Sequence, residues 1–209
     1  MLKMNKDNIS LIVVGFLTLF LELTLIRWLP SNILSLWYFS NIVLISSFLG
    51  IGIGSMMSSK FKDLFKWFPI ALLVFVSIVL SLRLFEVILP SDSPEWMWNY
   101  YYRGNTFSSS VFNIGVYWTL SIVFISNTIL FAFIGQKIGI LMSKFKPEYA
   151  YGLDLAGAIL GVIFFSVLVS FGGVLGSPVI WFLVIGVSVL WLLRESGDKL
   201  VKASACLAI

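Results

Sequence analysis

The sequence contains no histidine and only one cysteine, Cys206. Without histidine the chain cannot form a Ser-His-Asp triad, a histidine-ligated metal site or a histidine pH switch. A single cysteine cannot form an internal disulfide or a thiolate metal cluster. These absences exclude several common kinds of catalytic and metal centre. We therefore assign no catalytic residue, metal or cofactor to this chain.

Charged residues are also scarce. They make up 11% of the 209 residues, whereas hydrophobic residues make up 59% and the mean hydropathy is +1.01. A soluble domain is usually about half apolar and about a quarter charged. Because so few polar residues cannot cover a water-exposed surface, the composition predicts an integral membrane protein whose main partner is the lipid bilayer.

Long apolar runs are abundant, and a membrane-spanning helix needs roughly 20 apolar residues. The runs predict one all-α transmembrane domain, a polytopic bundle of about six helices. The predicted helices lie at 9–29, 33–58, 68–89, 110–136, 150–170 and 176–193. The final ASACLAI is typical of the first turns of a further, truncated helix from 203, or of a short amphipathic tail.

The connections between these runs alternate in charge. Lysine and arginine gather in the N-terminal tail, in the second and fourth connections and after the sixth run, whereas PSNILS and FGGVLGS carry no charge. Basic connections mark the cytoplasmic side. We therefore expect a multi-pass protein of the cell (cytoplasmic) membrane with both termini cytoplasmic. The net charge of +4 then reflects topology, and we expect no nucleic-acid partner.

The first run follows Lys3 and Lys6, as the apolar core of a signal peptide would. It is too long for that role and no small-residue cleavage site follows it, so we expect a retained helix. The loop 90–110 contains the aromatic stretch EWMWNYYYRG. This stretch fits an aromatic belt at the lipid headgroups or a stacking lid over an outer cavity.

The first and third predicted spans contain four charged residues, Glu22 and Arg27 in the first and Arg83 and Glu86 in the third. Each charge at mid-bilayer costs at least about 2.5–3.5 kcal/mol. Arg83 and Glu86 share a helical face, whereas Glu22 and Arg27 point about 140° apart. We expect Glu22 and Arg27 to face the bundle and pair with Arg83 and Glu86. Either the network is structural and holds helices together, with Arg27 and Arg83 extending to the outer interface and the acids as their partners, or it lines an outer cavity for a cationic or zwitterionic ligand.

The fifth predicted helix opens with AYGLDLAGAILG. Asp154 lies about one turn inside it and shares a face with Gly157 and Gly161, a pair whose spacing favours close helix contact. The helix dipole favours an acid near a helix N-terminus, so a capping or packing role competes with ligand binding at Asp154. Tyr151 and Asn41 are further candidates for ligand binding or packing.

The second predicted helix carries LGIGIGS. Gly50 and Gly54 share a face, while Gly52 is turned away. After so long an apolar run this glycine pattern is not a nucleotide-binding loop, and we expect Gly50 and Gly54 to pack against a neighbouring helix.

Three stretches together resemble the membrane portion of bacterial and archaeal spermidine synthase-like proteins. They are LELTLIRWL, YFSNIVLISSFLGIGIGS and YGLDLAGAILG, in that order along the chain. The resemblance implies a multi-helix membrane region joined to a soluble domain of the aminopropyltransferase or methyltransferase type. The glycine loop and amino-group-binding acids of such a domain are not in these 209 residues. The resemblance therefore implies family membership without aminopropyltransferase activity in this chain.

Three functions fit these observations. The first is a non-catalytic membrane module that anchors or feeds a soluble domain, either fused on the cytoplasmic side or supplied by a partner. The second is a structural or accessory subunit of a larger membrane complex. The third is a transporter for a small cation of the polyamine type, with Glu22, Glu86 and Asp154 as ligand-facing acids.

Overall fold

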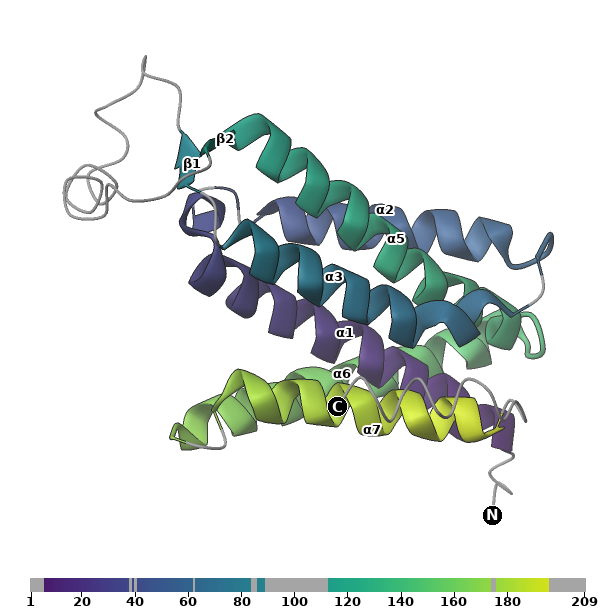
Figure 1. Cartoon of the computed structure of the whole chain (residues 1–209). Helices are drawn as coiled ribbons and strands as arrows, with labels where there is room; N and C mark the ends of the chain where they lie inside the picture. The colour runs from purple at the N-terminus through teal and green to yellow at the C-terminus, as the bar shows by residue number, and fades with distance from the viewer. Residues whose placement is uncertain are drawn as a thin grey trace.

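The computed structural model describes residues 6–37, 39, 41–61, 63–83, 86–88, 113–173 and 176–195 (Figure 1). Within these ranges the chain is a bundle of α-helices. The helices are α1 (Lys6–Asn32), α2 (Asn41–Met57), α3 (Phe68–Leu82), α5 (Val116–Met142), α6 (Pro147–Phe171) and α7 (Pro178–Glu195). The short elements are 3-10 helices η1 (Leu34–Trp37) and η2 (Leu64–Trp67) and strands β1 (Glu86–Ile88) and β2 (Asn113–Gly115).

Four of these helical segments are long and apolar enough to cross a membrane. They are α1, α5, α6 and the segment Leu64–Leu82, which joins η2 to α3. Helices α2 and α7 are apolar but shorter. The structure confirms the predicted class at this level: a helical bundle with long apolar helices that are compatible with a membrane.

Some predicted helix ends were wrong. The run 33–58 does not start a helix at 33, because α1 continues to Asn32 and α2 begins only at Asn41. At the end of α1, the side chains of Ser31 and Asn32 both donate to the carbonyl oxygen of Trp28, at 2.7 and 2.9 Å. Both side chains fold back onto the last turn of α1, where local side-chain donors compete with continuation of the helix.

The third and fourth predicted helices were also misplaced at their outer ends. Helix α3 stops at Leu82 and α5 begins at Val116. Between them, β1 and β2 pair in parallel, with Glu86 opposite Asn113 and Ile88 opposite Gly115. The expected aromatic loop 90–110 and the expected helix from 203 lie outside the described residues.

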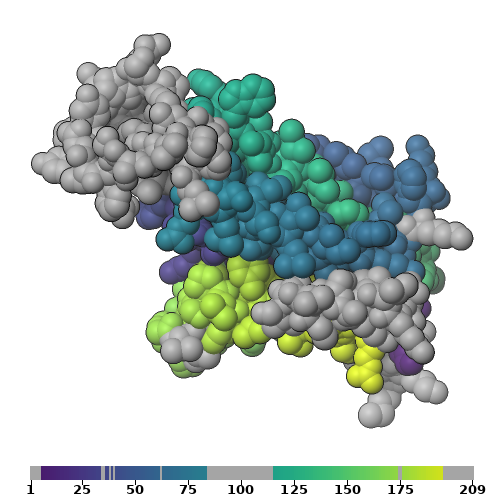
Figure 2. Space-filling model, in the orientation of Figure 1, coloured from purple at the N-terminus to yellow at the C-terminus, as the bar shows by residue number. Residues whose placement is uncertain are grey.

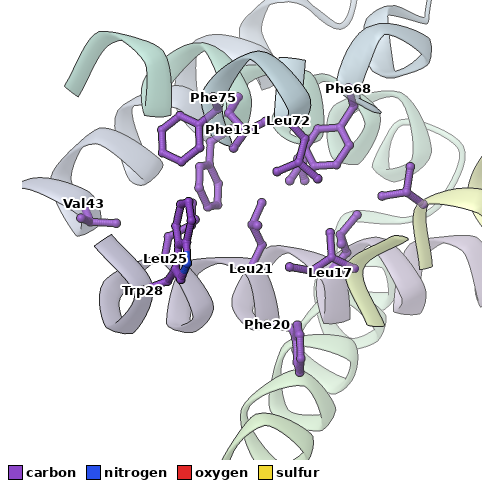
Figure 3. Close-up of a cluster of buried hydrophobic side chains, with 14 of the residues drawn as sticks. Leu17, Phe20, Leu21, Leu25, Trp28, Val43, Phe68, Leu72, Phe75 and Phe131 are labelled. Atoms are coloured by element: carbon purple, nitrogen blue, oxygen red, sulfur yellow. The ribbon is translucent and has the colours of Figure 1, made fainter. Parts of the chain in front are cut away.

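Helix α1 lies at the centre of the bundle and contacts α2, α3, α5, α6 and α7 (Figure 1). Figure 3 shows Leu21 of α1 pointing toward the layer that holds Phe75 and Phe131. Phe20 points the other way and packs edge-on against Phe165 of α6, with ring centroids 5.6 Å apart. Burying side chains on both sides of α1 joins the α2–α3–α5 layer to the α6–α7 pair.

Large apolar side chains also cover the outside of the bundle. Val74 of α3, Ile163 of α6 and Val187 of α7 are each more than half exposed. The outward faces of α3 and α7 form part of the surface in Figure 2. In water such a surface would be unfavourable, whereas lipid chains solvate it, which agrees with the membrane class.

A buried polar tract as candidate functional site

Glu22 lies near the middle of α1 and is only 3% exposed. Its Oε1 accepts a hydrogen bond of 2.7 Å from the hydroxyl of Ser47 on α2. The same hydroxyl lies 2.9 Å from the carbonyl oxygen of Leu44. Thus the bundle holds a carboxyl group in its interior, with a neutral serine as its hydrogen-bond partner.

A second polar contact stands directly beside the first. Asn127 of α5 is fully buried, and its Nδ2 donates to the hydroxyl of Ser46 at 2.7 Å and to the carbonyl oxygen of Val43 at 3.2 Å. Its Oδ1 is buried with no hydrogen-bond partner among the described residues. We call Glu22, Ser46, Ser47 and Asn127 the polar tract, because together they link α1, α2 and α5.

The local sequence explains why α2 can form hydrogen bonds with both α1 and α5. Consecutive helical residues point about 100° apart. Ser47 therefore reaches α1, while Ser46 reaches α5. Ser46 shares its face with Gly50 and Gly54, one and two helical steps of four residues further on. These glycines bring the α2 backbone against α5 and so set Ser46 within reach of Asn127.

The contact between α2 and α5 has no room for a side chain at either glycine. A Cβ atom at Gly50 would lie 2.8 Å from the Cβ of Phe131, and one at Gly54 would collide with the carbonyl oxygen of Ala132. A Cβ at Gly52 would meet nothing within 4 Å. The two glycines that the spacing placed on one face therefore lie at the helix contact, and the third points away from it.

Helices α1 and α6 are packed in the same way. A Cβ at Gly157 would collide with the carbonyl oxygen of Ile12, and one at Gly161 would lie 2.6 Å from the carbonyl oxygen of Phe16. Gly15 completes the contact from the α1 side, because a Cβ there would lie 2.9 Å from Oδ1 of Asp154. Backbones this close are typical of membrane helix pairs with small residues at their interface.

Asp154 sits against α1, and its Oδ1 is buried with no hydrogen-bond partner in the described part of the chain. The dipole interpretation of this residue is wrong, because α6 begins at Pro147 and Asp154 lies about two turns inside it. The dipole effect is confined to the first turn. Tyr151 and Asn41, the other two candidates, are exposed.

The expected four-charge network is corrected in two of its members. Arg27 and Arg83 are exposed, and no ion pair joins either of them to Glu22 within the described ranges. The guanidinium of Arg27 lies 5.9 Å from the centroid of the Trp181 ring on α7, a cation–π contact. The side chain of Glu86 lies outside the part of the structure that is described, so its role stays a prediction.

The sequence did not predict the polar contacts at the end of the bundle where α1 and α6 begin. Lys137 of α5 forms an ion pair of 2.7 Å with Asp63. Next to it, Gln136 accepts a hydrogen bond of 2.7 Å from the Leu64 amide and donates one of 3.0 Å to the carbonyl oxygen of Phe61. These bonds fix the connection between α2 and α3 to α5. They also explain why α5 continues past 136, where the prediction ended it.

A further ion pair joins the start of α1 to the connection before α6. Lys144 and Asp7 are 2.7 Å apart, and both side chains are exposed. Nearby, Nδ2 of Asn8 donates to the hydroxyl of Tyr149 at 3.1 Å. The charged residues that the sequence placed in separate connections thus meet at one end of the bundle.

Among the described residues, no three histidine, cysteine, aspartate or glutamate side chains gather into a possible metal site. Comparisons with protein-family models, curated proteins and solved structures gave no match. The resemblance to spermidine synthase-like proteins therefore rests on the three sequence stretches alone. What the site offers chemically is a buried carboxyl, two hydroxyls and an amide between three apolar helices.

Proposed function

We propose that this chain is a non-catalytic, six-span module of the cell membrane with both termini cytoplasmic. The observation that carries the topology is the meeting of charged residues at one end of the bundle. Lys137 with Asp63 and Lys144 with Asp7 lie where α1 and α6 begin and α5 ends. Positive connections are retained in the cytoplasm, so Lys137 and Lys144 support the assignment of this end to the cytoplasmic side.

Cysteine labelling tests this topology. In a Cys206→Ser background, Ser143→Cys at the end of α5 and Ser31→Cys at the end of α1 provide one probe for each side. A membrane-impermeant maleimide added to intact cells should label Ser31→Cys and spare Ser143→Cys, with the reverse in inside-out vesicles. Labelling of both residues from the same side would refute the six-span arrangement.

We propose that the module anchors or feeds a soluble domain of the spermidine synthase-like kind. In support, the stretches that carry the resemblance fall in the second half of α1, in α2 and in the first half of α6. They hold Gly50, Gly54, Gly157 and Gly161, which lie at the two close helix contacts. They also hold Glu22 and both serines of the polar tract. The resemblance thus falls on the residues that determine how the bundle packs.

Two measurements test this role. One is the intact mass of the native protein together with the coding sequence that follows codon 209. The other is purification in mild detergent, with identification of any protein that remains bound. A continuous or stably bound soluble domain with a glycine-rich nucleotide loop is expected. A native chain that ends at Ile209 and purifies without a partner would overturn the module hypothesis.

The buried position of Glu22 favours transport of a small cation, such as a polyamine, as a second candidate function. A carboxyl inside a membrane bundle is a default candidate for a substrate or ion pathway. Under this alternative, Glu22→Gln and Asp154→Asn abolish polyamine uptake or efflux while the folded yield stays the same. Normal transport by both variants, or none by the parent chain, rules it out.

A further inference from the structure

The polar tract is short of one hydrogen-bond donor. The Ser46 hydroxyl donates to the carbonyl oxygen of Val43, and the Ser47 hydroxyl has Glu22 and a backbone carbonyl within reach. Both amide hydrogens of Asn127 are used, on Ser46 and Val43. What remains is an acceptor, Oδ1 of Asn127, with no donor opposite it among the described residues.

The orientation of the Asn127 amide is fixed by its surroundings. The carbonyl oxygen of Val43 can only accept, so the amide atom facing it at 3.2 Å has to be the nitrogen. Exchanging the amide oxygen and nitrogen would set two acceptors against each other. The unsatisfied acceptor is therefore a property of the tract.

The two contacts of the tract start from adjacent residues of α2 and reach different neighbouring helices. They are anchored on Ser46 and Ser47, whose Cα atoms are about 3.8 Å apart across one peptide unit. All four side chains are at most 3% exposed. An ionised Glu22 would add a further acceptor and a buried charge, whereas a protonated Glu22 supplies one donor and no charge.

Within the described residues, no ionisable side chain pairs with Glu22 to compensate a charge on it. Helices α2 and α3 contain no ionisable residue, and Arg27 of α1 is exposed over Trp181. On α5, Tyr117 is exposed and Lys137 is paired with Asp63. The remaining ionisable residues of the packed helices lie in the terminal turns of α1 and α7 or in the first half of α6. They are Lys6, Asp7, Glu148, Tyr149, Tyr151, Asp154, Arg194 and Glu195.

We propose that the polar tract is an intramembrane proton-binding site in which Glu22 carries the proton as a neutral carboxylic acid. Ser47 positions the carboxyl by donating to Oε1. Ser46 and Asn127 hold α2 in the register that this contact needs. A buried carboxylate with one neutral hydrogen bond is strongly disfavoured in an apolar bundle, and binding a proton removes that cost.

Infrared difference spectroscopy of the full chain in lipid nanodiscs tests the proposal. A carbonyl stretching band of a protonated carboxylic acid is expected, shifted by transfer to D2O and lost in Glu22→Gln. Glutamine keeps the shape of the side chain and supplies a donor, so this variant should fold. Asp154→Asn is the matched control, and the Glu22 band should persist in it.

Ser47→Ala provides a second variant that keeps the carboxyl. Its band should remain and shift in frequency, because the hydrogen bond to Oε1 is gone. A purely structural serine, with an ionised Glu22, would leave only a carboxylate band in both chains. If Glu22→Gln does not fold, the Ser47→Ala shift still decides the question.

A hydrophobic carbodiimide gives an independent readout, because it reacts with protonated carboxyls inside membranes. Labelling at Glu22, unaffected by sodium, is expected, with loss of the label in Glu22→Gln. Protection by sodium ions would mean that the tract binds a metal cation instead. That result, or an infrared spectrum with Glu22 only as carboxylate, would overturn the proposal.

Discussion

Glu22 of α1 and Ser47 of α2 meet through a hydrogen bond of 2.7 Å inside the helix bundle. The two residues are 25 positions apart, and both are almost completely buried. This contact joins the central helix to α2, which in turn packs on α5 through Gly50 and Gly54. The polar tract therefore connects the closely packed α2–α5 pair to α1, which is itself closely packed against α6.

Removing the Ser47 hydroxyl should destabilise the bundle more than removing any exposed hydroxyl. Ser47→Ala leaves a buried carboxyl oxygen without its donor, which costs about 1–3 kcal/mol. We expect a lower midpoint of thermal unfolding in detergent, followed by circular dichroism. Ser55→Ala on the same helix is the control, because its hydroxyl contacts only the Gly52 carbonyl at an exposed position. Equal losses in the two variants would show that the Glu22 contact contributes no stability.

The glycines of α2 should respond very differently to the same added methyl group. In Gly54→Ala the new Cβ collides with the backbone of α5. Overpacking of this kind typically costs about 1–3 kcal/mol, through separation of the two helices. In Gly52→Ala the methyl group enters open space, and helix propensity can add up to about 1 kcal/mol of stability.

Both variants can be compared by unfolding in mixed detergent, with helix content as the readout. Because the two glycines are two residues apart on one helix, the pair separates packing from propensity. A Gly54→Ala protein as stable as Gly52→Ala would contradict the close contact between α2 and α5.

Helical periodicity alone identified which glycines share a face, because the spacing of four residues is a local property. It could not identify the opposing helix, since Gly54 meets Ala132 and Gly157 meets Ile12 from distant parts of the chain. Apolar run length likewise located a helix in each of the six predicted stretches. It misplaced ends where a side chain or a distant partner decides the boundary, as at Asn32 and Lys137.

The candidate site was predictable only in part. Glu22 is recognisable in the sequence as a charge within an apolar run, and Asn127 carries a similar but weaker signal as an amide within one. Their partners depend on tertiary packing, so spacing could not reveal Ser47 or Ser46. For Arg27, helical periodicity predicted that the side chain points away from Glu22. It could not predict the cation–π contact with Trp181, because Trp181 belongs to another helix, α7.

The two ion pairs at the cytoplasmic end we propose should differ in strength. Lys137 and Asp63 have side chains only 11% and 25% exposed, whereas Lys144 and Asp7 are 46% and 40% exposed. Breaking a fully buried pair costs roughly 3–5 kcal/mol. For this partly buried pair we expect Lys137→Met to cost somewhat less, about 2 kcal/mol. An exposed pair contributes about 0–1 kcal/mol, so Lys144→Met should have little effect.

The double variant Lys137→Met with Asp63→Asn distinguishes loss of the pair from loss of packing. Removing both charges should recover part of the stability lost in Lys137→Met, because no unpaired charge then remains. Thermal unfolding at low and high salt gives the readout, and the Lys144 pair should be the more salt-sensitive of the two. A double variant less stable than Lys137→Met would mean that Asp63 stabilises the bundle without Lys137.

Asp154→Asn should be tolerated and should stabilise the fold by about 1 kcal/mol. Its Oδ1 is buried against Gly15 without a hydrogen-bond partner among the described residues, and an unpaired acidic group at such a position is costly. Asparagine keeps the shape and removes the charge. The helix dipole, worth about 0.3–1 kcal/mol in a first turn, is weak two turns into α6. A higher unfolding midpoint for Asp154→Asn is therefore expected, with Glu148→Gln in the first turn of α6 as the control. A clear loss of stability in Asp154→Asn would show instead that the carboxylate has a stabilising partner.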